Sequence, residues 1–187
     1  VENSTGTLIC EEDTSMEQPV VSGIMSDKNQ AKITIKGVPD QPGIASKFFT
    51  GLADANLSVD MIIQNVSEEG HTDISFTLTK EDINEALKIV KKLGKIIKAR
   101  EISSDSDICK VSIVGAGMRS NPGVAAKMFS ALSRENINII MISTSEIRVS
   151  CIIDEKYGEL AVRVLHNAFN INSEQEKNAL NDGAQTA

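Results

Sequence analysis

The sequence contains an internal repeat in which a short strand pattern runs into a Pro-Gly corner and then a helix pattern. The first copy reads KITIKG and then PGIASKFFTGLADANLSVDMI, and the second reads KVSIVG and then PGVAAKMFSALSRENINIIMI. The loop between the glycine and the proline is longer in the second copy, Gly115 to Pro122, than in the first, Gly37 to Pro42. Two copies of one pattern in 187 residues predict two small units with the same fold.

Each copy is expected to form a βαββαβ unit. In the first, alternating apolar residues predict strands at 33–35, 59–63 and 74–78. Helices are expected from the corner to Asn56 and from Thr79 or Asp82 to Gly94, with KIIKAREIS, residues 95–103, as the fourth strand. The second copy follows the same order as far as Phe169 but lacks a convincing fourth strand. The predicted fold class is α+β, with two ferredoxin-like units in tandem.

A strand pattern without a partner, PVVSGIM at residues 19–25, precedes the first copy. Our hypothesis is that this segment completes the sheet of the second unit, so we expect the first unit to be inserted within the second. The predicted boundaries are 31–103 for the first unit and 19–30 plus 108–172 for the second. Residues 1–15 are expected to be a linker or the end of an upstream domain, and the polar residues 173–187 a disordered tail.

Composition excludes several classes of protein. The net charge of −7 argues against a nucleic-acid partner, and no apolar run is long enough to span a bilayer. Three cysteines without a CxxC motif predict no disulfide framework and fit a cytoplasmic protein. The two histidines are too far apart in sequence to suggest a metal site, and no arrangement of catalytic residues is recognisable.

The first Pro-Gly corner has the chemistry of an amino-acid site. A helix that begins there presents unpaired amides and the positive end of its dipole, which favour a carboxylate. Gly43 lets a ligand approach the backbone, and Asp40 could hold an ammonium group. Gln64 and Asn65, at the end of the following strand, could add amide contacts.

Two other interpretations of the corners exist. Pro-Gly before a helix is a common turn, and Asp is a common turn residue. The GAG at residues 115–117 is also similar to a dinucleotide-binding loop, but Ser120 occupies the position of its third glycine and no acidic ribose contact follows.

The segments DQPGIASKFFTGLADANLSVDMIIQN, HTDISFTL and VSIVGAGMRSNPGVAAKMFSALSRENINIIMISTSEIRVSCII together resemble the regulatory region of the aspartate kinase family, a tandem pair of ACT domains. The resemblance covers residues 6–169. GTLIC resembles the last strand of the family's kinase domain, and Met16 resembles an internal start from which some members make a separate regulatory subunit.

The resemblance implies an allosteric role without catalysis or a cofactor in this chain. Such regions bind threonine, lysine or both and inhibit the ATP-dependent phosphorylation of aspartate. The implied partners are a second copy of the chain, in a homodimer, and a catalytic domain or subunit. The effector would lie between the first unit of one chain and the second unit of another. The implied site residues are Asp40, Gly43, Ile44, Ala45, Ser58, Val59, Asp60, Gln64, Ser67 and Thr72 from the first unit, and Val124, Ala125, Asn136, Asn138 and Ile139 from the second.

The second corner departs from the first, with Ser120-Asn121 in place of Asp40-Gln41. Without a carboxylate, it is not expected to form an equivalent ammonium site. Two rival functions remain open: an enzyme in its own right, and an ACT dimerisation module that binds no effector. Gln64 suits a threonine hydroxyl and slightly favours threonine over lysine.

Overall fold

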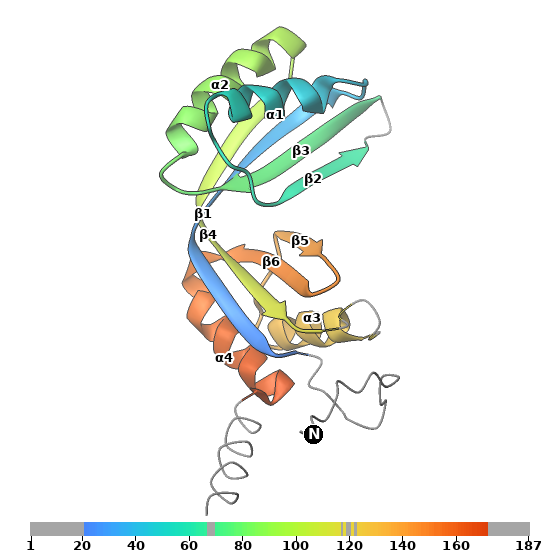
Figure 1. Cartoon of the computed structure of the whole chain (residues 1–187), viewed down its shortest axis with the longest axis vertical. Coiled ribbons are helices and arrows are strands. Elements are labelled where there is room, and N and C mark those ends of the chain that lie inside the picture. The colour runs from blue at the N-terminus through green and yellow to red at the C-terminus, as the bar shows by residue number, and fades with distance from the viewer. Residues whose placement is uncertain (1–20, 67–69, 117, 119–120, 122, 172–187) are drawn as a thin grey trace, which may run out of the picture.

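A computed structural model of the chain describes residues 21–66, 70–116, 118, 121 and 123–171 (Figure 1). The predictions for residues 1–15, Met16, Ser67 and 173–187 therefore lie outside the described residues. The elements, in chain order, are β1 (Gly23–Pro39), α1 (Ile44–Asp54), β2 (Ile62–Val66), β3 (His71–Leu78), α2 (Ile83–Ile97), β4 (Glu101–Val114), α3 (Val124–Arg134), β5 (Met141–Thr144), β6 (Arg148–Asp154), the 3-10 helix η1 (Glu155–Tyr157) and α4 (Gly158–Phe169).

The strands form one antiparallel sheet in the order β2-β3-β1-β4-β6-β5. Figure 1 shows two units that share the long strands β1 and β4. Helices α1 and α2 cover the sheet of the first unit, and α3 and α4 cover that of the second. Each unit has the strand order of a ferredoxin-like fold. The predicted fold class is therefore confirmed.

Strand β1 belongs to both units. Residues 31–39 pair with β3 in the first unit, whereas Gly23–Asp27 pair with Val114–Lys110 of the second. The Ser22 amide extends this second ladder by donating to the Val114 carbonyl at 2.8 Å. The strand pattern that precedes the first repeat thus completes the sheet of the second unit, as an inserted first unit requires.

The end of the first unit differs from the prediction. Helix α2 does not stop at Gly94 but continues to Ile97 and is capped by Lys98 in the left-handed conformation. Gly94 is buried, and a Cβ there would lie 2.5 Å from Ile102 Cδ1, so this glycine permits a close approach of helix and strand. The expected strand at 95–103 begins only at Glu101 and runs without a break into the second repeat.

The second strand of the first unit also begins later than expected. Val59 and Met61, predicted to lie in it, precede β2. The residues just before β2 are nevertheless held to β3. Asp60 N–H donates to the Thr77 carbonyl and Thr77 N–H donates to the Met61 carbonyl, both at 2.9 Å. Asn56 adopts the left-handed conformation expected at the end of α1, with φ 57°.

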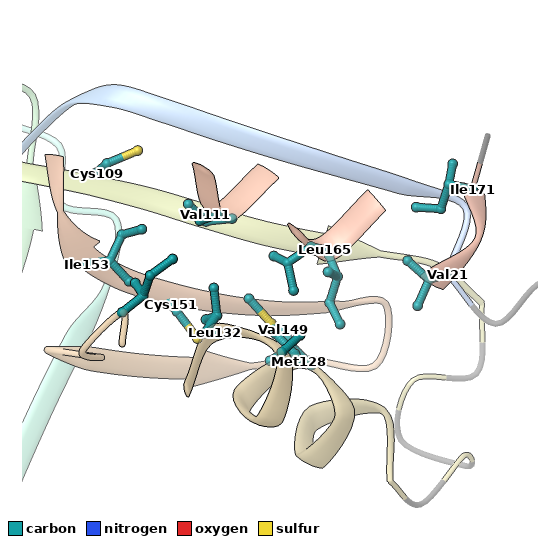
Figure 2. Packing of buried hydrophobic residues seen from close by; sticks show 14 of the residues in the cluster. Val21, Cys109, Val111, Met128, Leu132, Val149, Cys151, Ile153, Leu165 and Ile171 are labelled. Carbon is teal, nitrogen blue, oxygen red and sulfur yellow. The ribbon is translucent and has the colours of Figure 1, made fainter. Parts of the chain in front are cut away.

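Each unit has its own aliphatic core. The first is centred on fully buried side chains such as Ile33, Phe48 and Phe76. The second unites both helices with β4 and β6, as Figure 2 shows for Leu132, Cys151 and Leu165, among others. A smaller cluster of Met61, Ile108, Met141 and Ile152 joins the units.

Candidate functional site

A hollow of about 340 Å³ lies at the first corner, where the end of β1, the start of α1 and the β2–β3 hairpin meet. Six of the predicted site residues line it: Asp40, Gly43, Ile44, Ala45, Gln64 and Thr72. The remaining lining residues are Pro39, Gln41, Pro42 and Ile74. Pro39, Gln41 and Pro42 belong to or flank the Pro-Gly corner, so turn chemistry could have identified three of the four lining residues that the prediction omitted. The fourth, Ile74, lies on β3.

The N-terminus of α1 is open at this hollow. Its N-cap residue, Gly43, has φ 92° and no side chain, so no side-chain oxygen caps the amides of Ala45 and Ser46. The first backbone bonds here are Ile44 N–H to the Gln41 carbonyl at 3.3 Å and Lys47 N–H to the Gly43 carbonyl at 3.0 Å. Bare amides at a helix N-terminus attract an anionic group.

Two exposed polar side chains line the same hollow. Asp40 and Gln64 are exposed, and neither side chain has a hydrogen-bond or ion-pair partner within the part of the chain that the structure describes. The carboxylate can accept from an ammonium group, and the amide can both donate and accept. The hollow therefore offers complementary groups for both charges of an α-amino acid.

The β2–β3 hairpin fixes the other wall. The buried Thr72 hydroxyl donates to the Asn65 carbonyl across the hairpin. Asp40 N–H donates to the Gly70 carbonyl at 2.9 Å, which ties the corner to the same hairpin. Gln64 lies on β2 opposite Ile74, so its position depends on the register of β2 and β3.

The structure does not bring all the predicted residues together. Ser58 is exposed, Val59 packs on the first core, and the Asp60 carboxylate contacts Lys110; none of the three lines the hollow. Ser67 lies outside the described residues. Val124, Ala125, Asn136, Asn138 and Ile139 all belong to the second unit, and their approach to the first unit of another chain remains a prediction.

The second corner has a hollow of its own, of about 460 Å³. It is lined by Met118, Asn121, Gly123, Ala125, Thr144, Ser145, Glu146 and Val149. Helix α3 begins there at Gly123, with φ 100° and again no side-chain cap. The glycine N-cap is thus repeated as backbone geometry, but Asn121 provides no carboxylate, and the one that lines this hollow comes from Glu146.

Other reactive groups are buried or dispersed. Burial raises the pKa of the Cys151 thiol to about 12 and also raises that of Cys109. Among the described residues, no group of three or more His, Cys, Asp or Glu side chains is arranged to hold a metal ion. None of the described helices is both long and apolar enough to cross a membrane.

Comparison with known proteins identifies the two repeats. ACT-domain family profiles match residues 32–98 and 111–169. Aspartate kinase from Stutzerimonas stutzeri is 54% identical over 169 residues, which are 90% of this chain and 41% of that protein. Aspartokinase from Corynebacterium glutamicum is 46% identical over 178 residues, 93% of this chain and 42% of that protein. The chain thus spans about two fifths of the curated relatives.

Two solved structures match almost throughout their length. A chain in the crystal structure of aspartokinase alpha and beta subunits is 57% identical, with a TM-score of 0.76 over 80% of this chain and 99% of that chain. The ligand-free regulatory subunit of aspartate kinase from Thermus thermophilus is 45% identical, with a TM-score of 0.77 and the same coverage. The chain belongs to the aspartate kinase family, as a regulatory region built of two ACT domains.

Proposed function

We propose that this region binds an end-product amino acid, threonine or lysine or both, at the first corner and thereby inhibits ATP-dependent phosphorylation of aspartate by the catalytic part of the enzyme. The observation that carries the proposal is the grouping of the uncapped start of α1 at Gly43–Ala45, the Asp40 carboxylate and the Gln64 amide around one small hollow. Its volume lies near the lower end of the range of about 300–1,000 Å³ for small-molecule sites.

The effector's carboxylate would accept from the amides of Ala45 and Ser46, and its ammonium would donate to Asp40. The side chain would then face Gln64 and Ile74. A hydroxyl on a short side chain can bond to the Gln64 amide, which favours threonine. For lysine, Asp40 is the one carboxylate among the described residues that line the hollow, so none of these is left to receive the terminal ammonium.

Regulation requires the ligand to prefer one arrangement of the assembly over another. In the proposed homodimer, residues such as Ala125 and Asn138 of a second chain would close the hollow. An effector that contacts both chains then stabilises the closed dimer by its differential affinity for the two states. A closed dimer would hold the catalytic part in an inhibited arrangement.

Calorimetric titration of the chain with threonine, and separately with lysine, tests the proposal. Loss of one charge-assisted hydrogen bond costs about 1.5–3 kcal/mol, so Asp40→Ala is expected to weaken binding roughly 10- to 100-fold. Asp54→Ala is the matched control, because Asp54 is an exposed carboxylate at the other end of α1. Equal affinities of Asp40→Ala and wild type would refute the assigned role of Asp40.

The two rival functions predict other outcomes. A dimerisation module without an effector would give no heat with either amino acid. An enzyme in its own right would release ADP when the isolated chain is supplied with ATP and aspartate, whereas the proposal predicts no turnover. Adding threonine to the assembled enzyme should then lower its aspartate phosphorylation, and the Asp40→Ala enzyme should resist it.

A further inference from the structure

Within the described part of the chain, two strands join the two units covalently. β1 and β4 cross from one unit to the other as an antiparallel ribbon, at the waist of the molecule in Figure 1. The ladder is irregular at this crossing, between Asp27 and Gln30 and again between Gln30 and Lys32. Interrupted pairing bends and twists a ribbon locally, so this segment is the natural hinge between the units.

Two ion pairs bridge the units beside this hinge. On one side, Lys110 of β4 contacts the Asp60 carboxylate of the first unit, and its Nζ lies 3.8 Å from Asp27 Oδ2. The Gln30 side-chain amide donates to the same Asp27 oxygen at 2.7 Å and holds that carboxylate in place. The Lys110 side chain is only 15% exposed, so this cluster is less screened by salt than an ordinary surface pair.

The second bridge lies on the other face of the ribbon. Lys80, at the start of the turn into α2, contacts Glu155 of η1 at 2.6 Å, and both side chains are about one-third exposed, at 32% and 35%. Lys80 N–H also donates to the Asn29 side chain at 3.2 Å. η1 leads into α4 on the helical face of the second unit, whereas Lys110 alternates with the core residues Cys109 and Val111 and points to the opposite face.

We propose that the Lys110–Asp60 and Lys80–Glu155 pairs act as an electrostatic latch that sets the angle between the two units. Each pair adds little to the free energy of unfolding, but two pairs on opposite faces of a two-stranded hinge oppose bending in both directions. The small cluster of Met61, Ile108, Met141 and Ile152 lies beside the Lys110 pair and is the apolar part of the same contact.

The latch also gives the first corner a route to the second unit, a consequence that rests on the proposed function. Asp60 stands four residues before Gln64, and a strand of that length spans about 13 Å. Because Asp60 and Gln64 are both held to β3, a ligand that tilts the β2–β3 pair as a unit would displace Asp60 relative to Lys110. The orientation of the second unit would then depend on whether a ligand occupies the hollow at the first corner.

The distance between α2 and α4 tests the latch without any amino acid present. Spin labels on Lys92→Cys and Arg163→Cys, both exposed positions, would be measured by double electron–electron resonance in a Cys10→Ser background. Lys110→Met and Lys80→Met should each broaden the distance distribution, and the double variant should broaden it most. Lys156→Met is the matched control, since Lys156 pairs with Asp154 at 2.9 Å within the second unit.

Two further measurements of the same spin-label distance test whether the effect is electrostatic. High salt should broaden the wild-type distribution but leave the double variant unchanged. The charge swap Lys80→Glu with Glu155→Lys should restore the narrow distribution that Lys80→Glu alone loses, which shows that the variants remain folded. Distributions that overlay in wild type, Lys110→Met and Lys80→Met would overturn the latch, whatever the titrations with threonine and lysine show.

Discussion

At the scale of single residues, the candidate site depends on the absence of a side chain at the helix cap. Gly43 occupies the left-handed region with no atom within 4 Å of where a Cβ would stand, so the space before α1 stays open. A side chain at this position would be strained at φ 92° and would occupy the space before the Ala45 and Ser46 amides. The glycine therefore leaves the positive end of the helix available.

The buried thiols allow a test of packing at the same scale. With a pKa of about 12, Cys151 carries almost no thiolate at pH 8, so we expect it to react with a disulfide reagent only after unfolding in guanidinium chloride. The unfolded thiol ionises near 9.0, so the free energy of unfolding should fall as the pH rises above that value. Rapid labelling of Cys151 in the native protein at pH 8, located by mass spectrometry, would contradict its burial.

At the scale of elements, strand β1 decides how the units are connected. Ile24 packs against the second core, whereas its neighbour Met25 is 47% exposed on the other face of the strand. We expect Ile24→Ser to lower the free energy of unfolding by about 2 kcal/mol and Met25→Ser to change it by about 0.5 kcal/mol or less. Denaturant titrations of the two variants measure both values. Equal effects would mean that this part of β1 does not belong to the second unit.

Much of the element pattern could be predicted from the repeat and the apolar periodicity. The missing fourth strand of the second copy and the unpaired PVVSGIM segment predicted the shared β1. The end of α2 could not be predicted, because Gly94 is a helix stop locally but a packing residue against Ile102 in the folded chain. The contact of Asp60 with Lys110 could not be predicted either. It depends on how the two units are placed relative to each other, and no local sequence pattern determines that placement.

For the candidate site too, features set by local sequence could be predicted, whereas features that depend on tertiary contacts could not. The corner residues Asp40 and Gly43 were recognisable from turn chemistry, and Gln64 from its place at the end of a strand, whereas Ile44, Ala45 and Thr72 entered through family resemblance. Ile74 was missed as a lining residue because its alternation predicts only a core strand. The residues of the second unit entered through family resemblance alone, and their role depends on a second chain.

At the scale of the whole molecule, two cores share one pair of strands. Phe48 is fully buried in the first core, and Phe48→Ala is expected to cost about 3–5 kcal/mol. Because β1 and β4 run through both units, loss of the first should also release the edge strand of the second. Hydrogen exchange followed by mass spectrometry should therefore show faster exchange in α3 and α4 as well as in α1. Unchanged protection in α3 and α4 would show that the units unfold independently.

The measurement that tests the account most directly is an amide NMR titration of the whole chain with threonine and, separately, with lysine. The account predicts saturable shifts of the Ala45 and Ser46 amides with at least one of the two. Half-saturation should need a roughly 10- to 100-fold higher concentration in Asp40→Ala but not in Asp54→Ala. Saturable shifts confined to the second corner, around Gly123 and Val124, or no shifts with either amino acid, would contradict it.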